Sequence, residues 1–197
     1  MTYQIKTATR KEFNSNELFE MHRLRRRIFK ERMGWEVPVL AGLEIDGYDA
    51  LEPYYMMIRC PAERKLLGCW RALPTNGPYM LKDTFPELLY GQDAPEDSRV
   101  WELSRFAVES NGPQGFGFSG VSMDVVREIV SFGVRMGIKH YVLVTTVAIE
   151  RLMRNAGLSI SRFGPPMRIG VEKTVALSFD IGEQTQAALF GPQLKAA

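Results

Sequence analysis

Charged residues interrupt several segments whose other residues follow the apolar pattern of buried elements. VWELSRFAV contains Glu102, Ser104 and Arg105 among aromatic and aliphatic residues, GCWRAL contains Arg71, and Arg25 falls on the apolar stripe of a helical segment. An isolated buried charge costs roughly several kcal/mol, so such residues need partners or a wet surface. Either they form an internal ion-pair network that fixes the fold, or they line a polar cleft. Their occurrence in three separate segments favours the cleft.

Strand geometry adds a condition on two of these residues. In a regular strand, Glu102 and Ser104 share one face while Arg105 points to the other. Glu102 and Arg105 can act in one site only if the strand is irregular, and β-bulges re-aim side chains in this way beside active sites. We therefore predict a bulge between Glu102 and Arg105.

Other polar residues give weaker signals. Asp46 and Asp49 lie in the glycine-containing loop EIDGYD, where carboxylates usually cap turns and where the full EF-hand ligand pattern is missing. His22 and His140 have no second ligand at metal spacing, so we expect structural histidines and no metal site. The segment NGPQGFGFSG precedes a helix, and its N–H groups could hold a phosphate or pantetheine, or simply form a turn.

The elements that must position these residues can be predicted from periodicity. We expect helices at about 16–33, 85–90, 122–136 and 149–157, the first capped by Ser15 or Asn16 and ended by Gly34. Strands are expected at 2–8, 53–60, 66–73, 99–108, 140–147 and 174–181, with 140–147 central. Interleaved strands and helices predict a mixed sheet with helices packed on it, of the α/β or α+β class, in a single domain of residues 1–197.

Composition excludes several classes of protein. The 197 residues include 25 basic and 23 acidic side chains, a net charge of +2 that lacks the strong field of a nucleic-acid binder. Cys60 and Cys69 form no recognised spacing pattern, which favours reduced thiols over a disulfide. No apolar run is long enough for a membrane span, and the N-terminus carries charges where a secretory signal is apolar. We expect a cytoplasmic protein.

Four motifs taken together are specific. LRRRIFKERMGW, EIDGYDA, GCWRAL and VWELSRFAV, in this order, resemble the N-acyl-homoserine-lactone synthase (autoinducer synthase) family of Gram-negative bacteria. The resemblance extends over the whole chain and is nearest to the branch that makes long-chain 3-oxoacyl signals. The positions that match the family's invariant residues are Arg25, Phe29, Trp35, Asp46, Asp49, Arg71, Glu102 and Arg105.

The resemblance implies a fold, two substrates and a reaction. The fold would be that of the GCN5-related N-acetyltransferases, a three-layer α/β/α arrangement whose sheet is splayed to admit a pantetheine-linked acyl chain. The substrates would be acyl-[acyl carrier protein] and S-adenosylmethionine, with no cofactor. The amine attacks the acyl thioester, and the methionyl carboxylate then attacks its own γ-carbon, which releases 5′-methylthioadenosine and an N-acyl-homoserine lactone.

Catalytic roles are assigned as hypotheses. Glu102 would accept the amine proton, directly or through one water, with its geometry set by Arg105. Arg25 and Arg71 could orient the substrate carboxylate or tie down the two aspartates of the EIDGYD loop. The S-adenosylmethionine cleft would comprise Arg25, Phe29, Trp35, Asp46, Asp49 and Arg71, with the two aromatic residues either stacking on adenine, covering the sulfonium or serving as core.

Further residues are assigned to the acyl donor. Ser104, Thr145 and Thr146 could donate to the thioester oxygen, or one threonine could bind a 3-oxo group. Phe106 is assigned with the threonines to the acyl and pantetheine path. Acyl carrier proteins are acidic, so a basic patch or merely a solvated face is predicted from Lys139, Arg151, Arg154, Arg168 and Lys173. The rival functions are an ordinary acyl-CoA N-acyltransferase and a non-catalytic sensor of S-adenosylmethionine or acyl chains.

Overall fold

The computed structural model describes residues 3–62, 64–109 and 121–191. The chain divides into two compact units, the first formed by Met1–Ala72 and Ser104–Ser122 and the second by Leu73–Leu103 and Met123–Ala197. Two strands, β5 (Lys65–Pro74) and β6 (Val100–Val108), contribute residues to both units.

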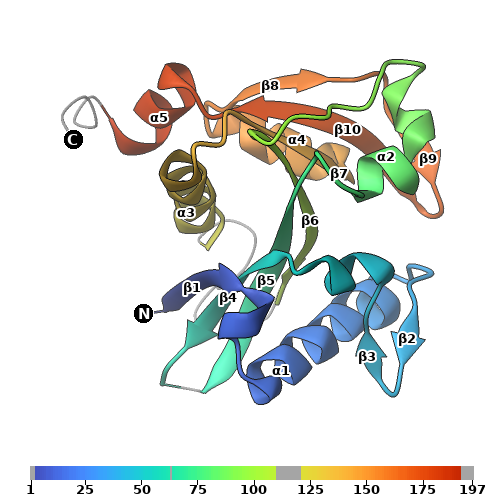
Figure 1. Cartoon of the computed structure of the whole chain (residues 1–197), viewed down its shortest axis with the longest axis vertical. Coiled ribbons are helices and arrows are strands. Elements are labelled where there is room, and N and C mark those ends of the chain that lie inside the picture. Colours follow the sequence, from blue (N-terminus) through green and yellow to red (C-terminus); the bar gives the residue numbers. More distant parts are fainter. Residues whose placement is uncertain (1–2, 63, 110–120, 192–197) are drawn as a thin grey trace. The chain divides into compact units, whose positions relative to one another are not determined.

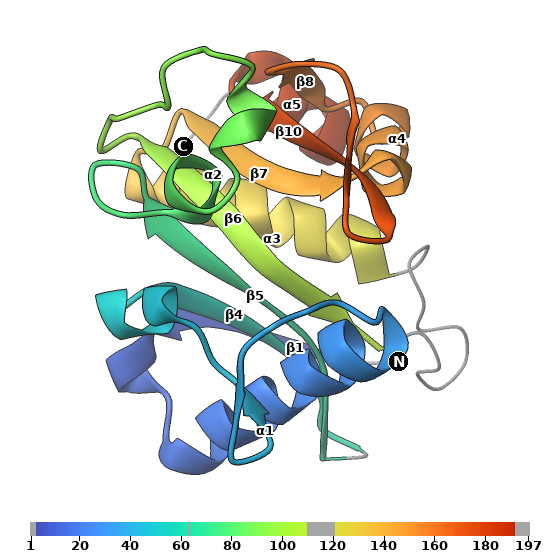
Figure 2. The ribbon, with the colours of Figure 1, turned by 90° about the vertical axis from the view of Figure 1, so that its right-hand side faces the viewer.

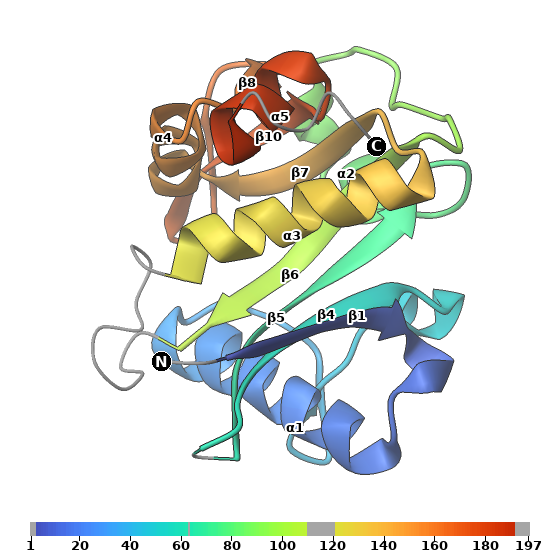
Figure 3. The same ribbon diagram turned by 90° about the vertical axis from the view of Figure 1, so that its left-hand side faces the viewer.

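The first unit is built on antiparallel strands covered by a helix. β1 (Gln4–Thr9) pairs with β4 (Tyr54–Cys60), and β4 pairs with β5. Helix α1 (Ser15–Arg26) runs along these strands, as Figure 3 shows. Its apolar side is buried in a core that includes Met21, Leu24, Tyr55 and Met57.

The first predicted helix differs from the structure in its start and its continuation. Asn14 is the N-cap, and neither predicted cap, Ser15 or Asn16, takes this role. The Asn14 side chain accepts a hydrogen bond from the Glu17 N–H at 3.0 Å, and the Glu17 carboxylate accepts from the Asn14 N–H at 2.9 Å. This reciprocal capping box satisfies two N–H groups at once, which a later cap could not do. After α1 the chain continues as a π-helix, Arg27–Arg32, and ends at Gly34 with a φ of +68°, as predicted.

A short hairpin and a 3-10 helix complete the first unit. β2 (Val39–Leu40) pairs with β3 (Leu43–Glu44), and the 3-10 helix Gly47–Leu51 follows. A further 3-10 turn, Arg10–Glu12, joins β1 to α1.

The second unit has a central strand between a parallel and an antiparallel neighbour. β7 (His140–Thr146) is parallel to β6 over Val100–Leu103 and antiparallel to β10 (Glu172–Asp180). β8 (Ser159–Arg162) and β9 (Met167–Ile169) both pair with β10. The predicted central position of the HYVLVTT strand within this group is confirmed.

Helices cover both faces of these strands (Figures 1 and 2). On one face Tyr141 donates from its hydroxyl to the Ile129 carbonyl of α3 (Val121–Met136) at 3.0 Å. On the other face α2 (Met80–Asp83) and the 3-10 helix Pro86–Leu89 pack on Val142 and Ala176. α4 (Val147–Asn155) follows β7, and α5 (Glu183–Phe190) follows β10. The predicted mixed α/β class is confirmed, although α2 and α5 were not among the predicted helices.

Candidate active site

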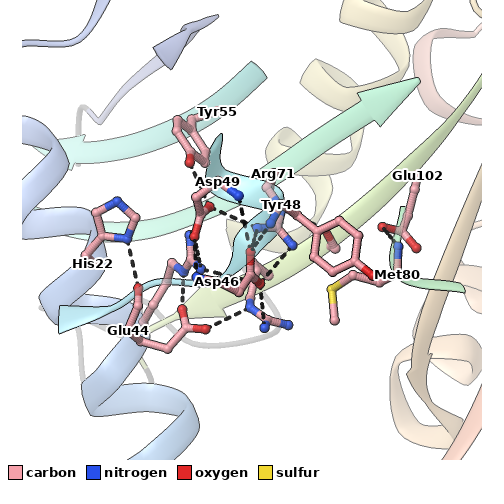
Figure 4. A network of polar contacts seen from close by, with 12 residues as sticks. His22, Glu44, Asp46, Tyr48, Asp49, Tyr55, Arg71, Met80 and Glu102 are labelled. Atoms are coloured by element: carbon pink, nitrogen blue, oxygen red, sulfur yellow. Dashed lines mark hydrogen bonds and ion pairs between the residues drawn. The ribbon is translucent and has the colours of Figure 1, made fainter. Parts of the chain in front are cut away.

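A network of buried ion pairs occupies the first unit (Figure 4). The Arg25 side chain donates from Nη1 and Nη2 to the two carboxylate oxygens of Asp49, at 2.8 and 2.9 Å, and from Nε to Glu44. Arg25 and Glu44 are both 0% exposed. A fork of two parallel N–H···O bonds is the strongest geometry that an arginine and a carboxylate can form.

A second arginine joins the loop to two strands. Arg71 on β5 donates from Nη1 to Asp46 at 2.5 Å and to Asp49 at 2.9 Å, and from Nη2 to Asp46 at 3.1 Å. Its Nε donates to the Ser104 hydroxyl of β6 at 3.1 Å. The structure thus supports the predicted alternative in which Arg25 and Arg71 tie down Asp46 and Asp49.

The third arginine lies at the margin of the network. Arg105 donates from Nε to Glu44 at 3.0 Å and pairs through Nη2 with Asp46 at 2.7 Å. The Arg105 and Asp46 side chains are 11% and 9% exposed, whereas those of Arg25 and Arg71 are 1% and 0% exposed. Arg105 and Asp46 are therefore the network members that solvent reaches most readily.

The charges of this network balance. Three guanidinium groups face three carboxylates, contributed by Arg25, Arg71, Arg105, Glu44, Asp46 and Asp49. Burial alone would raise the pKa of Asp49, but hydrogen bonds and charge from Arg25 and Arg71 outweigh burial and hold that pKa well below its ordinary value. Burial and the neighbouring Asp49 raise the pKa of Tyr55, whose hydroxyl donates to Asp49 at 2.7 Å. The network consequently stabilises the ionised form of Asp49, and its three carboxylates are matched by three guanidinium groups.

The local sequence explains why the loop carboxylates converge. Asp46 caps the 3-10 helix Gly47–Leu51 by accepting from the N–H groups of Tyr48 at 3.0 Å and Asp49 at 3.2 Å. The Asp49 carboxylate accepts in return from the Asp46 N–H at 2.9 Å. The predicted turn-capping role of these residues is therefore present, and it also aims both carboxylates at the arginines.

Sequence reasoning missed two members of the site. Glu44 was part of the EIDGYD motif but was not selected, although a charge that follows Leu43 in a buried strand was an available signal. Tyr55 gave no signal because an aromatic residue in a strand is ordinary core. His22 takes the structural role that was expected: its Nδ1 lies 2.8 Å from the Glu44 carbonyl oxygen, and burial, with the charge of Arg25, lowers its pKa.

The two aromatic residues assigned to the cleft stack on each other. The rings of Phe29 and Trp35 are parallel within 3°, with centroids 5.3 Å apart. The backbone N–H of Trp35 donates to the Phe29 carbonyl at 2.8 Å. The Arg105 guanidinium carbon lies 5.8 Å from the Phe29 ring centroid. Phe29 is 1% exposed and Trp35 is partly exposed, so Phe29 belongs to the core while Trp35 keeps some accessible surface.

Glu102 is placed in the second unit and has backbone partners there. Its Oε2 accepts from the Met80 N–H at 3.0 Å and its Oε1 from the Leu81 N–H at 2.7 Å (Figure 4). The side chain is nearly inaccessible, and the residue is 1% exposed. The pairing of β6 with β7 is regular through Leu103, and the irregularity falls at Arg105, whose φ is +56°. No register shift is recorded over Val100–Leu103, so the bulge predicted between Glu102 and Arg105 stays a prediction.

The three residues assigned to the acyl path belong to different units, Phe106 to the first and the two threonines to the second. Thr145 and Thr146 are successive strand residues, so their side chains point to opposite faces of β7. The Thr146 hydroxyl accepts from the Ile149 N–H at 3.4 Å as the N-cap of α4. Phe106 lies in the first unit, 37% exposed, with its ring 6.0 Å from that of Trp70.

The predicted basic patch is divided. β10 is antiparallel to β7, with Asp180 opposite His140 and Thr174 opposite Thr146. Lys139 and Lys173 consequently lie just beyond opposite ends of the strand pair, roughly 26 Å apart at about 3.3 Å per residue. Grouping them was wrong because nearness in sequence is not nearness along antiparallel strands.

Two arginines of this region share one carboxylate. Arg154 and Arg162 both bond the Glu150 carboxylate, with the Arg154 Nε at 3.0 Å and the Arg162 Nη2 at 2.6 Å. Arg168 donates to its own hairpin, at the Gly170 carbonyl, and Arg151 is exposed on α4. Arg162 was not predicted.

Some expectations concern features that the structure does not contain or describe. The NGPQGFGFSG segment lies wholly outside the described residues. Over the described ranges, no group of three or more potential metal ligands occurs, and no helix is long and apolar enough to cross a membrane. Cys60 and Cys69 are buried free thiols.

Comparisons with known proteins agree with the motifs. The family model for autoinducer synthase matches residues 9–189. An acyl-homoserine-lactone synthase from Pseudomonas aeruginosa is 48% identical over 188 residues, which is 95% of this chain and 94% of the relative. The crystal structure of the AHL synthase LasI superimposes with a TM-score of 0.91 at 47% identity, covering 96% of this chain and 95% of that one.

More distant solved structures show which fold the chain shares. A CoA-dependent acyl-homoserine lactone synthase, BjaI, solved with SAM and isopentyl-CoA, has a TM-score of 0.85 at 25% identity, over 95% of this chain and 88% of that one. An acyl-CoA N-acyltransferase from Pseudomonas aeruginosa has a TM-score of 0.61 at 12% identity, over 90% of this chain and 99% of that one. The N-acetyltransferase-like fold implied by the motifs is confirmed. The chain belongs to the autoinducer synthase family, and it is an acyl-homoserine-lactone synthase, an acyltransferase.

Proposed function

We propose that this synthase acylates the amine of S-adenosylmethionine from an acyl-[acyl carrier protein] and then closes the lactone. The observation that carries the proposal is 48% identity to an acyl-homoserine-lactone synthase along nearly the whole chain. S-adenosylmethionine as substrate is supported by the related synthase BjaI, which was solved with SAM. That relative is CoA-dependent, so the carrier-protein donor rests on the sequence motifs. A long-chain 3-oxoacyl group, such as 3-oxododecanoyl, rests on the same resemblance.

The first chemical step forms an amide. The neutral amine attacks the thioester carbonyl carbon, the C–S bond breaks, and the carrier thiol leaves with a proton. Before the attack the ammonium form of the amine must lose a proton, which Glu102 is proposed to accept, directly or through one water. The proton that the nitrogen loses after the attack is the one that leaves on the carrier thiol. Each of its oxygens already accepts one backbone N–H, so the proton would be taken on a remaining lone pair. Ser104 and Thr145 stay candidates for hydrogen-bonding the thioester oxygen.

The second step closes the ring. A carboxylate oxygen attacks the γ-carbon, the bond from that carbon to the sulfonium breaks, and its electron pair leaves on 5′-methylthioadenosine. The sulfonium is already a good leaving group, so this step chiefly needs orientation. We assign the contact with the charged substrate to Arg105 and Asp46, because they are the most accessible members of the network. Arg25 and Arg71 would act by holding the loop that carries Asp46.

Two assays test this function. Mass spectrometry of medium from a heterologous bacterium that expresses the chain should detect an N-acyl-homoserine lactone and identify its acyl group. Release of 5′-methylthioadenosine by purified protein should then be compared for one acyl chain on carrier protein and on CoA. A higher kcat/KM with the carrier supports the proposed donor, and preference for CoA contradicts it. Binding of S-adenosylmethionine without release would contradict the reaction itself.

The base role of Glu102 needs its own variant. Glu102→Gln keeps the side-chain volume and one acceptor, and it should lower kcat by about 10²–10⁴-fold, the usual contribution of a general base. The acidic limb of the kcat profile, in which the base becomes protonated, should also disappear. A folded variant with near-normal kcat would remove Glu102 from this role.

A further inference from the structure

Three consecutive backbone N–H groups at the start of α2 donate to carboxylates. The Tyr79 N–H donates to Asp83 Oδ2 at 3.0 Å, the Met80 N–H to Glu102 Oε2 at 3.0 Å, and the Leu81 N–H to Glu102 Oε1 at 2.7 Å. α2 has only four residues, too few to be stable alone. Its first N–H groups have no hydrogen-bond acceptors within the helix, so the carboxylates of Asp83 and Glu102 serve as their acceptors.

This turn is fixed to the strands on which it packs. Tyr79 and Leu81 are both 0% exposed and belong to a core with Val142 of β7, the residue opposite Glu102 in the β6–β7 register. The Tyr79 hydroxyl donates to the Pro95 carbonyl at 2.7 Å. Because Glu102 is held through both oxygens, the plane of its carboxylate follows the orientation of the turn.

Asp83 closes the same turn from its exposed side. Its N–H donates to the Tyr79 carbonyl at 3.0 Å while its carboxylate accepts from the Tyr79 N–H, so residue 79 is held at both backbone groups. Asp83 itself is exposed. Removing its side chain would open no cavity, but it would free the first of the three N–H groups and let the next two move.

We propose that Asp83 is a positioning residue for Glu102: it keeps the Met80 and Leu81 N–H groups aimed at the Glu102 carboxylate and thereby fixes the direction of the remaining lone pairs. The inference rests on the proposed proton transfer to Glu102, since orientation of a carboxylate matters to rate only if that carboxylate takes part. The alternative is a cap that stabilises α2 and has no effect on turnover.

The experiment combines backbone protection with kinetics. Asp83→Ala removes the acceptor, Asp83→Asn keeps an uncharged acceptor, and Glu87→Ala removes an exposed carboxylate from the neighbouring 3-10 helix as a matched control. We expect Asp83→Ala to speed hydrogen exchange at the Tyr79, Met80 and Leu81 amides. We expect it to lower kcat about fivefold, the factor that corresponds to the stability typically lost with a helix cap. The pH dependence of kcat should not move. Asp83→Asn should restore most of the rate, and Glu87→Ala should match the parent protein.

A double variant separates failure of this inference from failure of the base role. If Asp83 acts through Glu102, Asp83→Ala should change kcat little when Glu102→Gln is already present. Equal fold-losses in both backgrounds would overturn the positioning role while leaving the base role intact. Faster amide exchange with unchanged kcat, or unchanged exchange, would also overturn it. Near-normal kcat in Glu102→Gln alone would instead reject the base role.

Discussion

Neutralising Asp49 should unbalance the buried network of the first unit. Asp49 is 4% exposed and accepts hydrogen bonds from Arg25, Arg71 and Tyr55 and from the backbone of Asp46. Asp49→Asn has almost the same volume, so packing is retained. The substitution leaves three guanidinium groups facing two carboxylates, and it places an amide NH₂ among donors that need acceptors.

The expected cost follows from the burial of the remaining charges. Removing one partner of a buried ion pair costs about 3–5 kcal/mol because a charge is left uncompensated. Domain stabilities are about 5–15 kcal/mol, so this loss is a large share of the free energy of unfolding. For a chain of this length each kcal/mol lowers Tm by about 2–4 °C, and we expect a decrease on the order of 10 °C.

Urea and thermal denaturation, followed by circular dichroism, measure this effect. Glu52→Gln is the matched control in the same unit, since it breaks an ion pair with Lys11 whose side chains are 54% and 71% exposed. An exposed pair contributes at most about 1 kcal/mol, so the control should shift Tm little. If Asp49→Asn loses no more stability than Glu52→Gln, the network does not need its charge balance and the reasoning is refuted.

Three other predictions follow from the same structure. The pKa of Asp49 is lower in the folded protein than its unfolded value of about 4, so its stabilising effect is full above that pH and is lost as pH falls. Urea denaturation between about pH 4 and pH 2 should therefore show that the free energy of unfolding falls less steeply in Asp49→Asn than in the parent protein. Equal slopes would contradict the assignment. Arg151→Glu should raise KM for the carrier-linked substrate but not for S-adenosylmethionine. Lys139→Glu, at the other end of β7, should leave both KM values unchanged. An unchanged KM in Arg151→Glu would exclude the α4 surface as the docking site of the carrier protein. Burial raises the pKa of Cys69 to about 12, so a thiol reagent should label it only on unfolding, and rapid labelling of native protein would contradict that burial.

The sequence by itself singled out five of the six charged residues of the ion network and predicted most of the elements. Arg25 and Arg71 stood out because a charged residue in an apolar segment can be recognised from the sequence alone. The free-energy cost of burying that charge requires a partner. Long periodic segments predicted α1, α3 and β7, since burial of one face imposes a spacing on the chain. The order of the four motifs predicted the family, which the comparisons confirm.

Only the tertiary structure decided which partners these residues take. Glu44 closes the ion network from a two-residue strand, and no local pattern selects its partners from other segments. α2 escaped prediction because its N–H groups are satisfied by Glu102, which lies 21 and 22 residues away in sequence.

Strand pairing also overruled one grouping made from sequence, because register separated Lys139 from Lys173. The physical reason is common to all these cases: periodicity records that a side chain is buried, whereas hydrogen-bond partners, strand register and charge balance depend on segments that meet only in the folded chain.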